Sequence, residues 1–355
     1  MSLIASGPPY QFAACSTNRI MLEVIFACIP GITITTWFFG WGTLINITLA
    51  CVMALALEAG MLALRGRAPV QHLRDNSALV TAVLLGIALP SISAWWMIAL
   101  ATVFAIVIAK HLYGGLGQNV FNPAMCGYVF LLITFPLHMS GWHAPGGDEY
   151  NPLGLHSLYL SLQMTFPFLA GGAESYRELA DGLAMATPLL DPGSAAGNAI
   201  NRALEGNLNL FSPGAETGYE MISMGYLAGG LFLLFRNIIS WHIPASILVT
   251  VAALAVVFYN PDDPGIYGTP WLHLFGTPTM LGAFFIATDP VSAATTPRGK
   301  LLYGVIIGCC IYSIRSWGAY PDSVAFAILF GNFCASFIER VTVPTVYGSR
   351  GRQIK

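Results

Sequence analysis

Apolar runs of about 20 residues recur along this chain, and they constrain its fold more than any other feature. A bilayer core is crossed by roughly 20 mostly apolar helical residues, and several of the runs are interrupted by Gly or Pro. The chain is 55% hydrophobic and only 9% charged, a balance that water-soluble folds of this length rarely show. We therefore predict an all-α integral membrane protein.

The runs predict about ten transmembrane helices. They lie at about residues 20–39, 43–64, 76–90, 94–110, 120–138, 221–236, 241–259, 270–287, 301–316 and 322–339. A further apolar stretch, Leu153–Gly171, contains His156 and Gln163 and is broken by Pro167. Its short apolar core predicts a helix at the membrane interface or inside a loop domain rather than an eleventh span.

The distribution of Lys and Arg predicts the orientation. With a cytoplasmic N-terminus, twelve of the 15 Lys and Arg residues fall on the inner side, and Arg177, Arg202 and Arg315 fall outside. This strong positive-inside bias places both termini in the cytoplasm. The predicted organisation is a first membrane half at 1–138, an outer loop at 139–220, a second membrane half at 221–340 and a cytoplasmic tail at 341–355. Five spans in each half give the halves opposite orientations, so an internal duplication would be an inverted repeat.

Several functional classes lack support in this sequence. The net charge of -2 and the absence of a basic stripe argue against a nucleic-acid partner. Hydrolase, zinc-protease and nucleotide-binding motifs are absent, as are Cys and His at metal spacing. The seven Cys lie mostly in apolar runs and indicate buried small residues, while the seven His occur singly and indicate interfacial polar groups.

Ionisable residues inside predicted spans are candidates for function, because burying a charge in lipid is costly. Glu23, Glu58 and Asp289 qualify by position. Each also has a structural interpretation. Glu23 lies four residues after Arg19 and would pair with it on one helix face, and Glu58 would approach Arg65 or the interface. Asp289 would cap a helix, coordinate a cation or hold the following loop.

Two segments at the predicted membrane edge are rich in Gly, Pro and small polar residues. They are "YGGLGQNVFNPAMCGY" (Tyr113–Tyr128) and "ATDPVSAATTPRGKLLYG" (Ala287–Gly304), in corresponding places of the two halves. Backbone outside a regular helix is tolerated in a bilayer only where other protein groups or the water of a cavity form hydrogen bonds with its N–H and C=O groups. Asn119 and Asn122 therefore either cap the next helix or line a cavity for an ion or cofactor. Together with Thr288, Asp289 and Glu23 they form the candidate ion path or cavity.

The predicted outer loop contains "LADGLAMATPLLDPG", in which Thr187 precedes Pro188. Pro pushes the preceding residue to extended geometry, so Thr187 would simply end a short helix. Alternatively, its hydroxyl, with Asp181 nearby, would accept a phosphoryl group, since positioning and a carboxylate-held metal supply most of the catalysis in such transfers.

The segments "YGGLGQNVFNPA", "FFIATDPVSAATTPRGKLLYG", "RDNSALVTAVLLGIALP" and "DGLAMATPL" together resemble the D subunit of the Rnf (Rsx) electron-transport complex. The resemblance spans essentially the whole chain, and the B subunit of the sodium-pumping NADH:quinone reductase is a more distant relative. It implies a membrane scaffold similar to the urea transporters. It also implies covalent FMN, attached by a flavin transferase through a phosphoester to Thr187.

The transferase recognises a pattern like D-x-x-[ST]-G-A-T. Here Asp181, Ala186 and Thr187 match it, whereas Ala184 and Met185 depart from it. Gly182 and Pro188 complete the implied flavin attachment site.

The resemblance further implies a function in the bacterial inner membrane. The protein would relay electrons between ferredoxin and NAD, coupled to movement of Na⁺ or H⁺, with the flavin loop in the periplasm. Its partners would be the A, B, C, E and G subunits of the Rnf complex, and riboflavin is a possible second flavin without assigned residues. The chain would be a redox subunit rather than an enzyme alone. The alternatives are a B-type quinone-reductase subunit, a channel of the urea-transporter type, and a scaffold without flavin.

Overall fold

A computed structural model describes residues 17–69, 73–140, 142, 158–170, 215–259, 270–276, 278–318 and 322–342 of the chain. The regular elements of these residues are all helices. In the first half they are α1 (Thr17–Phe39), α2 (Gly42–Leu64), α4 (Ser77–Ala88), α5 (Trp95–Val103), the π-helix η1 (Phe104–Leu112), α6 (Pro123–Thr134) and α7 (Pro136–Ser140).

Two short helices follow, α8 (Leu158–Thr165) and the 3₁₀-helix η2 (Pro167–Ala170). The second half contains α11 (Ala215–Phe235), α12 (His242–Val257), α14 (Pro270–Phe275), α15 (Thr279–Leu281), the π-helix η3 (Gly282–Ile286), α16 (Pro297–Trp317) and α17 (Ser323–Thr342). The expectation of an all-α protein with several membrane-spanning helices is confirmed. Within the described ranges, five helical segments are long and apolar enough to cross a membrane: Thr17–Phe39, Gly42–Leu64, Trp95–Leu112, Gly218–Phe235 and Ser323–Thr342.

Two of the other predicted spans are broken at positions that the sequence explains, whereas α4, α12 and α16 are continuous helices. The expected span at 270–287 is broken, because α14 ends at Phe275, α15 begins at Thr279, and Gly276 and Pro278 lie between them. The span expected at 120–138 begins at Pro123 and is interrupted at Phe135, the residue before Pro136. In the stretch expected to be an interfacial or loop helix, α8 has only eight residues, too few to cross a bilayer, and it contacts α2.

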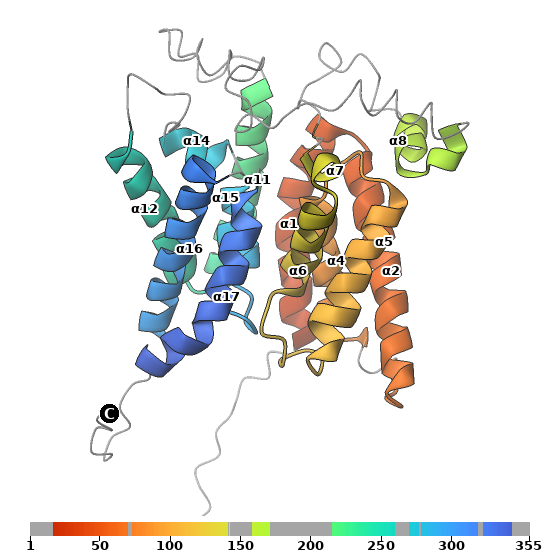
Figure 1. Cartoon of the computed structure of the whole chain (residues 1–355), viewed down its shortest axis with the longest axis horizontal. Helices are drawn as coiled ribbons and strands as arrows, with labels where there is room; N and C mark the ends of the chain where they lie inside the picture. Colours follow the sequence, from red (N-terminus) through yellow and green to blue (C-terminus); the bar gives the residue numbers. More distant parts are fainter. Residues whose placement is uncertain are drawn as a thin grey trace, which may run out of the picture.

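The helices form two groups, one from each half of the chain. In Figure 1 the first half (red to yellow) stands on one side and most of the second half (green to blue) on the other. The groups are joined where α1 packs on α11 and where α6 packs on α17. The end at which α2 and α17 terminate, and α1, α4 and α16 begin, is called the lower face; it is the lower end of Figure 1.

Small residues permit the close approach of α1 and α11. A Cβ at Gly229 would overlap the carbonyl oxygen of Ala27, and a Cβ at Gly31 would overlap the ring of Tyr226. Helices in a bilayer gain little from hydrophobic burial against each other, so such close backbone contact is a main source of their association. The joint between the two halves therefore depends on glycine.

Candidate functional site

The structure brings the two Gly- and Pro-rich segments of the sequence together in one pocket. This interhalf pocket lies between the halves near the lower face, and both segments contribute to its polar lining, Asn119 and Asn122 from one and Thr288 and Asp289 from the other. Its apolar lining comes from α1, α4, α11 and η3, and includes Met21, Val24, Leu84, Leu233, Phe284 and Phe285. Four of the predicted cavity residues are thus neighbours, although the two segments lie in opposite halves of the chain.

Asn122 has both of the properties that were considered for it. Its Oδ1 accepts hydrogen bonds from the backbone N–H groups of Ala124 (3.0 Å) and Met125 (3.4 Å), and Pro123 follows it. This is an N-cap with Pro in the first turn. Its Nδ2 donates to the carbonyl oxygen of Ile286 at 3.3 Å, in the other half. One side chain therefore begins α6, lines the pocket and joins η3 to the first half.

Asn119 is the polar residue of this pocket with unused hydrogen-bonding capacity. Its Nδ2 donates to the carbonyl oxygen of Phe121 at 3.0 Å. Its Oδ1 is buried and has no hydrogen-bond partner among the described residues. Because buried polar atoms are nearly always hydrogen-bonded, this oxygen is the candidate acceptor of the pocket.

Asp289 stabilises the turn that follows η3. Its Oδ2 accepts from the Ser292 hydroxyl at 2.8 Å, and its Oδ1 accepts from the Val291 N–H at 3.4 Å. Neighbouring Thr288 donates to the Phe284 carbonyl oxygen at 2.6 Å. Of the three interpretations of Asp289, the structure shows the one in which it holds its loop.

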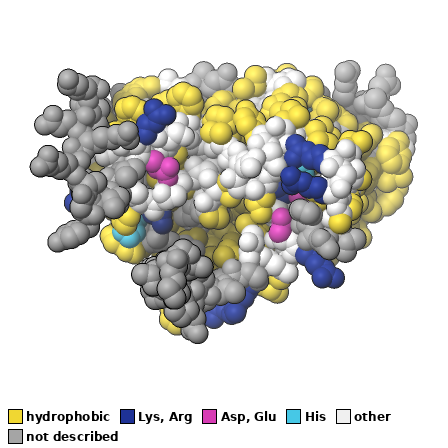
Figure 2. All heavy atoms as spheres, turned by 90° about the horizontal axis from the view of Figure 1, so that it is seen from below, with side chains coloured by type: hydrophobic (Ala, Val, Ile, Leu, Met, Phe, Trp, Pro, Cys, Tyr) yellow, Lys and Arg dark blue, Asp and Glu magenta, His cyan; other side chains and the backbone are white. Residues whose placement is uncertain are grey.

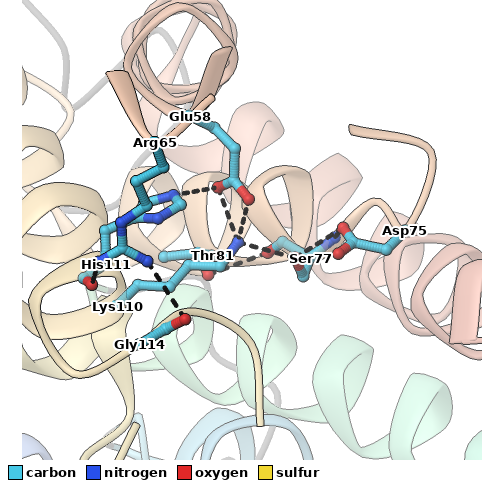
Figure 3. Close-up of polar contacts among 8 residues, drawn as sticks. All are labelled: Glu58, Arg65, Asp75, Ser77, Thr81, Lys110, His111 and Gly114. Carbon is cyan, nitrogen blue, oxygen red and sulfur yellow. Dashed lines mark hydrogen bonds and ion pairs between the residues drawn. The ribbon is translucent and has the colours of Figure 1, made fainter. Parts of the chain in front are cut away.

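A second polar group lies beside the pocket, and the sequence did not predict it. Lys110, at the end of η1, donates from Nζ to both carboxylate oxygens of Glu58 at 2.7 Å and to the Ser77 hydroxyl at 2.8 Å. The side chains of Lys110 and Glu58 are 3% and 4% exposed. Ser77 in turn donates to Asp75 Oδ1 at 2.7 Å. We call Glu58, Asp75, Ser77 and Lys110 the Glu58 cluster (Figure 3).

Two expectations about this region are wrong. Glu58 does not pair with Arg65, whose guanidinium instead donates to the carbonyl oxygens of His111 and Gly114. Lys110, the last residue of the span expected at 94–110, is buried beside Glu58. His111 is likewise buried rather than interfacial, with Nε2 3.7 Å from Glu58 Oε2. A usable signal was present, since Glu58 and Lys110 are opposite charges near the inner ends of two predicted spans, 43–64 and 94–110.

Glu23 is paired more extensively than expected. The predicted contact with Arg19 is confirmed, with Nε 3.0 Å from Oε1. Arg236, which follows α11, also donates to both Glu23 oxygens at 3.0 and 3.2 Å. Glu23 therefore joins α1 to the second half at the lower face. It is not among the residues that line the interhalf pocket.

The residues of the implied flavin attachment, Asp181, Gly182, Ala186, Thr187 and Pro188, lie outside the described residues. Their assignment remains an expectation from the resemblance.

The fold and the pocket define the class of this molecule. It is a multi-pass, all-helical membrane protein whose halves meet at a pocket lined by motifs from both. A family model described as the NQR2, RnfD, RnfE family matches residues 4–348, and the chain belongs to that family.

Relatives named as the D subunit of an ion-translocating oxidoreductase complex match over almost the whole length. The chain is 47% identical to the one from Aeromonas hydrophila subsp. hydrophila over 353 residues, which cover 98% of this chain and 99% of the relative. It is 47% identical to that of Yersinia enterocolitica serotype O:8, covering 97% and 98%. It is 46% identical to that of Vibrio cholerae serotype O1, covering 98% and 100%.

Proposed function

We propose that this chain is the D subunit of an ion-translocating oxidoreductase complex of the Rnf type. The observation that carries this proposal is the identity of 46–47% to relatives of that name over 97–98% of the chain. In the complex it relays electrons between ferredoxin and NAD, coupled to Na⁺ or H⁺ movement, and it assembles with the A, B, C, E and G subunits.

The proposed redox group of this protein is FMN, bound covalently to Thr187 after modification by a flavin transferase. Support comes from the sequence, in which Asp181, Ala186 and Thr187 match the attachment pattern of the family. Asp181 and Gly182 would place the loop for the transferase. The chemistry that bound FMN supplies is the transfer of one or two electrons.

A second, non-covalent flavin is proposed for the interhalf pocket. Support comes from the lining, which combines the apolar side chains of Phe284 and Phe285 with Asn119 Oδ1, a buried acceptor without a hydrogen-bond partner among the described residues. The cavity measures about 150 Å³, which in a protein core holds a single benzene-sized ring. A three-ring flavin such as riboflavin would therefore require the two halves to move apart at the pocket.

The proposed location is the bacterial inner membrane, with the lower face in the cytoplasm and the outer loop in the periplasm. Nine of the ten Lys and Arg residues in the described ranges are at or near the lower face, and Arg315 is near the opposite end. Figure 2, which looks onto the lower face, shows Lys and Arg side chains spread over it. Positive charge accumulates on the cytoplasmic side of membrane proteins.

Helix packing supports the proposed ten-span inverted repeat, with its likeness to urea transporters. If α1, α2 and α6 correspond to α11, α12 and α17, then α4 should correspond to η3. In agreement, α4 contacts α1, α2 and α6, while η3 contacts α11, α12 and α17. The contacts of α1 with α11 and of α6 with α17 would lie on the two-fold axis. An experimental structure whose halves failed to superpose after such a rotation would reject the repeat.

The proposed cofactors are tested by separating bound from released flavin in the purified complex. The chain is denatured, its intact mass is measured, and the supernatant is analysed for free flavin. The wild type should show a mass increment equal to FMN, and Thr187→Val should lose it. Asn119→Leu should keep the covalent FMN and release less riboflavin than the wild type.

Other results would favour other functions. An unmodified wild-type chain would reject covalent FMN and favour the scaffold or the channel. Released riboflavin that is unchanged in Asn119→Leu would reject the pocket as its site. A complex purified from the native host that oxidises NADH with quinone, and not with ferredoxin, would identify the B-type alternative.

A further inference from the structure

Arg315, near the end of α16, is the only Lys or Arg among the described residues that lies toward the outer end, opposite the lower face. Its Nη1 donates to the carbonyl oxygen of His273 at 2.8 Å, and its Nη2 donates to the Thr279 hydroxyl at 2.9 Å. His273 belongs to α14 and Thr279 begins α15, so Arg315 joins the two sides of the broken span. Both partners are neutral, and they do not balance the positive charge of Arg315.

No carboxylate of the described residues forms an ion pair with Arg315. The ion pairs found there all involve Glu23 or Glu58. Asp322 interacts with Arg315 electrostatically from a longer distance, and its Oδ1 accepts from the Val324 N–H at 2.9 Å where α17 begins. Burying a charge inside a membrane protein is costly, so such a residue usually has a partner of opposite charge.

The first half of the chain has a buried cation in the corresponding place, and that cation is paired. Lys110, near the end of η1, donates to the hydroxyl of Ser77, which begins α4, and to the carboxylate of Glu58 on α2. In the proposed inverted repeat, α2 corresponds to α12, and α4 corresponds to η3, which continues α15. Arg315 likewise lies near the end of its helix and donates to the hydroxyl of Thr279, which begins α15. Arg315 is therefore the second-half equivalent of Lys110.

The second-half equivalent of Glu58 is not an acid. Trp41 and Trp241 directly precede α2 and α12, so Glu58 and Phe258 lie equally far along the chain from these two starts. The Phe258 ring stacks on that of Tyr312 in α16, with ring centroids 5.8 Å apart. This position thus contacts the helix that carries the cation, as Glu58 does in the first half. The second half keeps the cation of the pair and lacks its carboxylate.

Tyr312 adds a buried hydroxyl to the same place. The side chain is 0% exposed, and its hydroxyl has no hydrogen-bond partner among the described residues. Tyr312 precedes Arg315 by three positions, so both lie on one side of α16, and its ring centroid is 5.2 Å from that of His273. We propose that Arg315 and Tyr312 form an anion site at the outer end, which binds the phosphodiester of the FMN proposed on Thr187. The site rests on that proposed function.

The chemistry of the two side chains fits a phosphodiester. A guanidinium has five N–H donors in a planar fork that matches phosphate oxygens, and Arg315 donates two hydrogen bonds to the protein. Gly308, on the same side of α16, packs against Thr250 of α12, so this side faces protein rather than lipid. A ligand tethered to the same chain has an effective concentration on the order of millimolar, which a site of modest affinity can capture.

The experiment measures how fast phenylglyoxal, an arginine-specific reagent, modifies Arg315 in the purified whole complex. Peptide mass spectrometry reports each arginine separately, and the intact mass shows whether FMN is attached. Arg315 should react about tenfold faster in Thr187→Val than in the wild type, the ratio expected when bound ligand occupies most of the sites. Arg298, which is exposed at the lower face, is the internal control and should react equally in both. A wild-type chain made without the flavin transferase repeats the comparison without a substitution.

Added inorganic phosphate should restore the protection of Arg315 in Thr187→Val, whereas chloride at the same ionic strength should not. Tyr312→Phe in the same background should require about tenfold more phosphate for equal protection, the scale of one hydrogen bond to a charged group. Ser313→Ala is the matched control on α16, because Ser313 is exposed. Its phosphate dependence should equal that of Thr187→Val alone.

Two results would overturn the anion site while leaving covalent FMN standing. One is equal modification of Arg315 in the wild type with its FMN mass and in Thr187→Val without it. The other is modification of Arg315 in Thr187→Val that phosphate does not slow. A wild-type chain without the FMN mass would instead reject the covalent flavin and, with it, the ligand assigned to this site.

Discussion

Lys110 and Glu58 show how strongly a single buried contact can control the stability of this protein. The two side chains form a hydrogen-bonded ion pair at 2.7 Å, and both are almost fully buried. Removing one partner of such a pair leaves an uncompensated charge, which typically costs about 3–5 kcal/mol, whereas removing both is often nearly neutral. The pair is therefore costly to break and less costly to delete.

We expect Lys110→Met to lower the free energy of unfolding by about 3–5 kcal/mol, and the double variant Glu58→Gln with Lys110→Met to recover most of that loss. The midpoint of thermal unfolding of the purified complex measures both. Arg19→Met is the control, since its side chain is 65% exposed and an exposed pair contributes about 0.2–1 kcal/mol. A double variant as unstable as the single one would show that charge burial is not the cause.

At the scale of helices, the joint between α1 and α11 depends on the absence of side chains at two glycines. We expect Gly229→Ala to destabilise the protein by about 1–3 kcal/mol, the usual cost of inserting atoms into a filled interface, because its Cβ would overlap the Ala27 carbonyl oxygen. Gly60→Ala is the control on α2, where a Cβ would meet nothing within 4 Å. Ala favours helix over Gly, so the control should be neutral or slightly more stable.

Thermal unfolding midpoints of the two glycine variants provide the comparison. Equal midpoints for Gly229→Ala and Gly60→Ala would mean that the α1 and α11 backbones are not in close contact in the membrane.

The π-helices η1 and η3 are a second feature at the scale of helices. Such helices are uncommon and often occur at functional sites. Here the last turn of η1 contains Lys110 and His111, and η3 supplies Phe284 and Phe285 to the pocket.

For the whole molecule, the testable property is orientation. We expect Leu137→Cys, on α7 at the end opposite the lower face, to react with a membrane-impermeant maleimide in intact spheroplasts. Arg298→Cys, at the start of α16, should react only after permeabilisation. Both sites are exposed, with Leu137 85% accessible, and both variants are made in a chain whose native cysteines are replaced. The reverse labelling pattern would place the lower face outside the cell.

Several properties could be predicted because they are local in the chain. A bilayer demands a minimum apolar length from each spanning helix, and this requirement is read from consecutive residues. The Glu23 and Arg19 pair lies within one helical turn, and the Asn122 cap precedes its helix by one residue. The family resemblance likewise rests on short continuous motifs. The sequence by itself therefore determined the membrane class, most of the helices and the family.

Only the tertiary structure decided which residues meet across helices. Glu58 and Lys110 are 52 positions apart, Glu23 and Arg236 are 213 apart, and Asn122 and Ile286 are 164 apart. A water-soluble helix reveals its inner face by its polar stripe, but helices that are apolar all round carry little record of their rotation. The partner of each buried polar group depends on that rotation and on the packing of the two halves. For this reason the pocket and the Glu58 cluster emerged only from the folded chain.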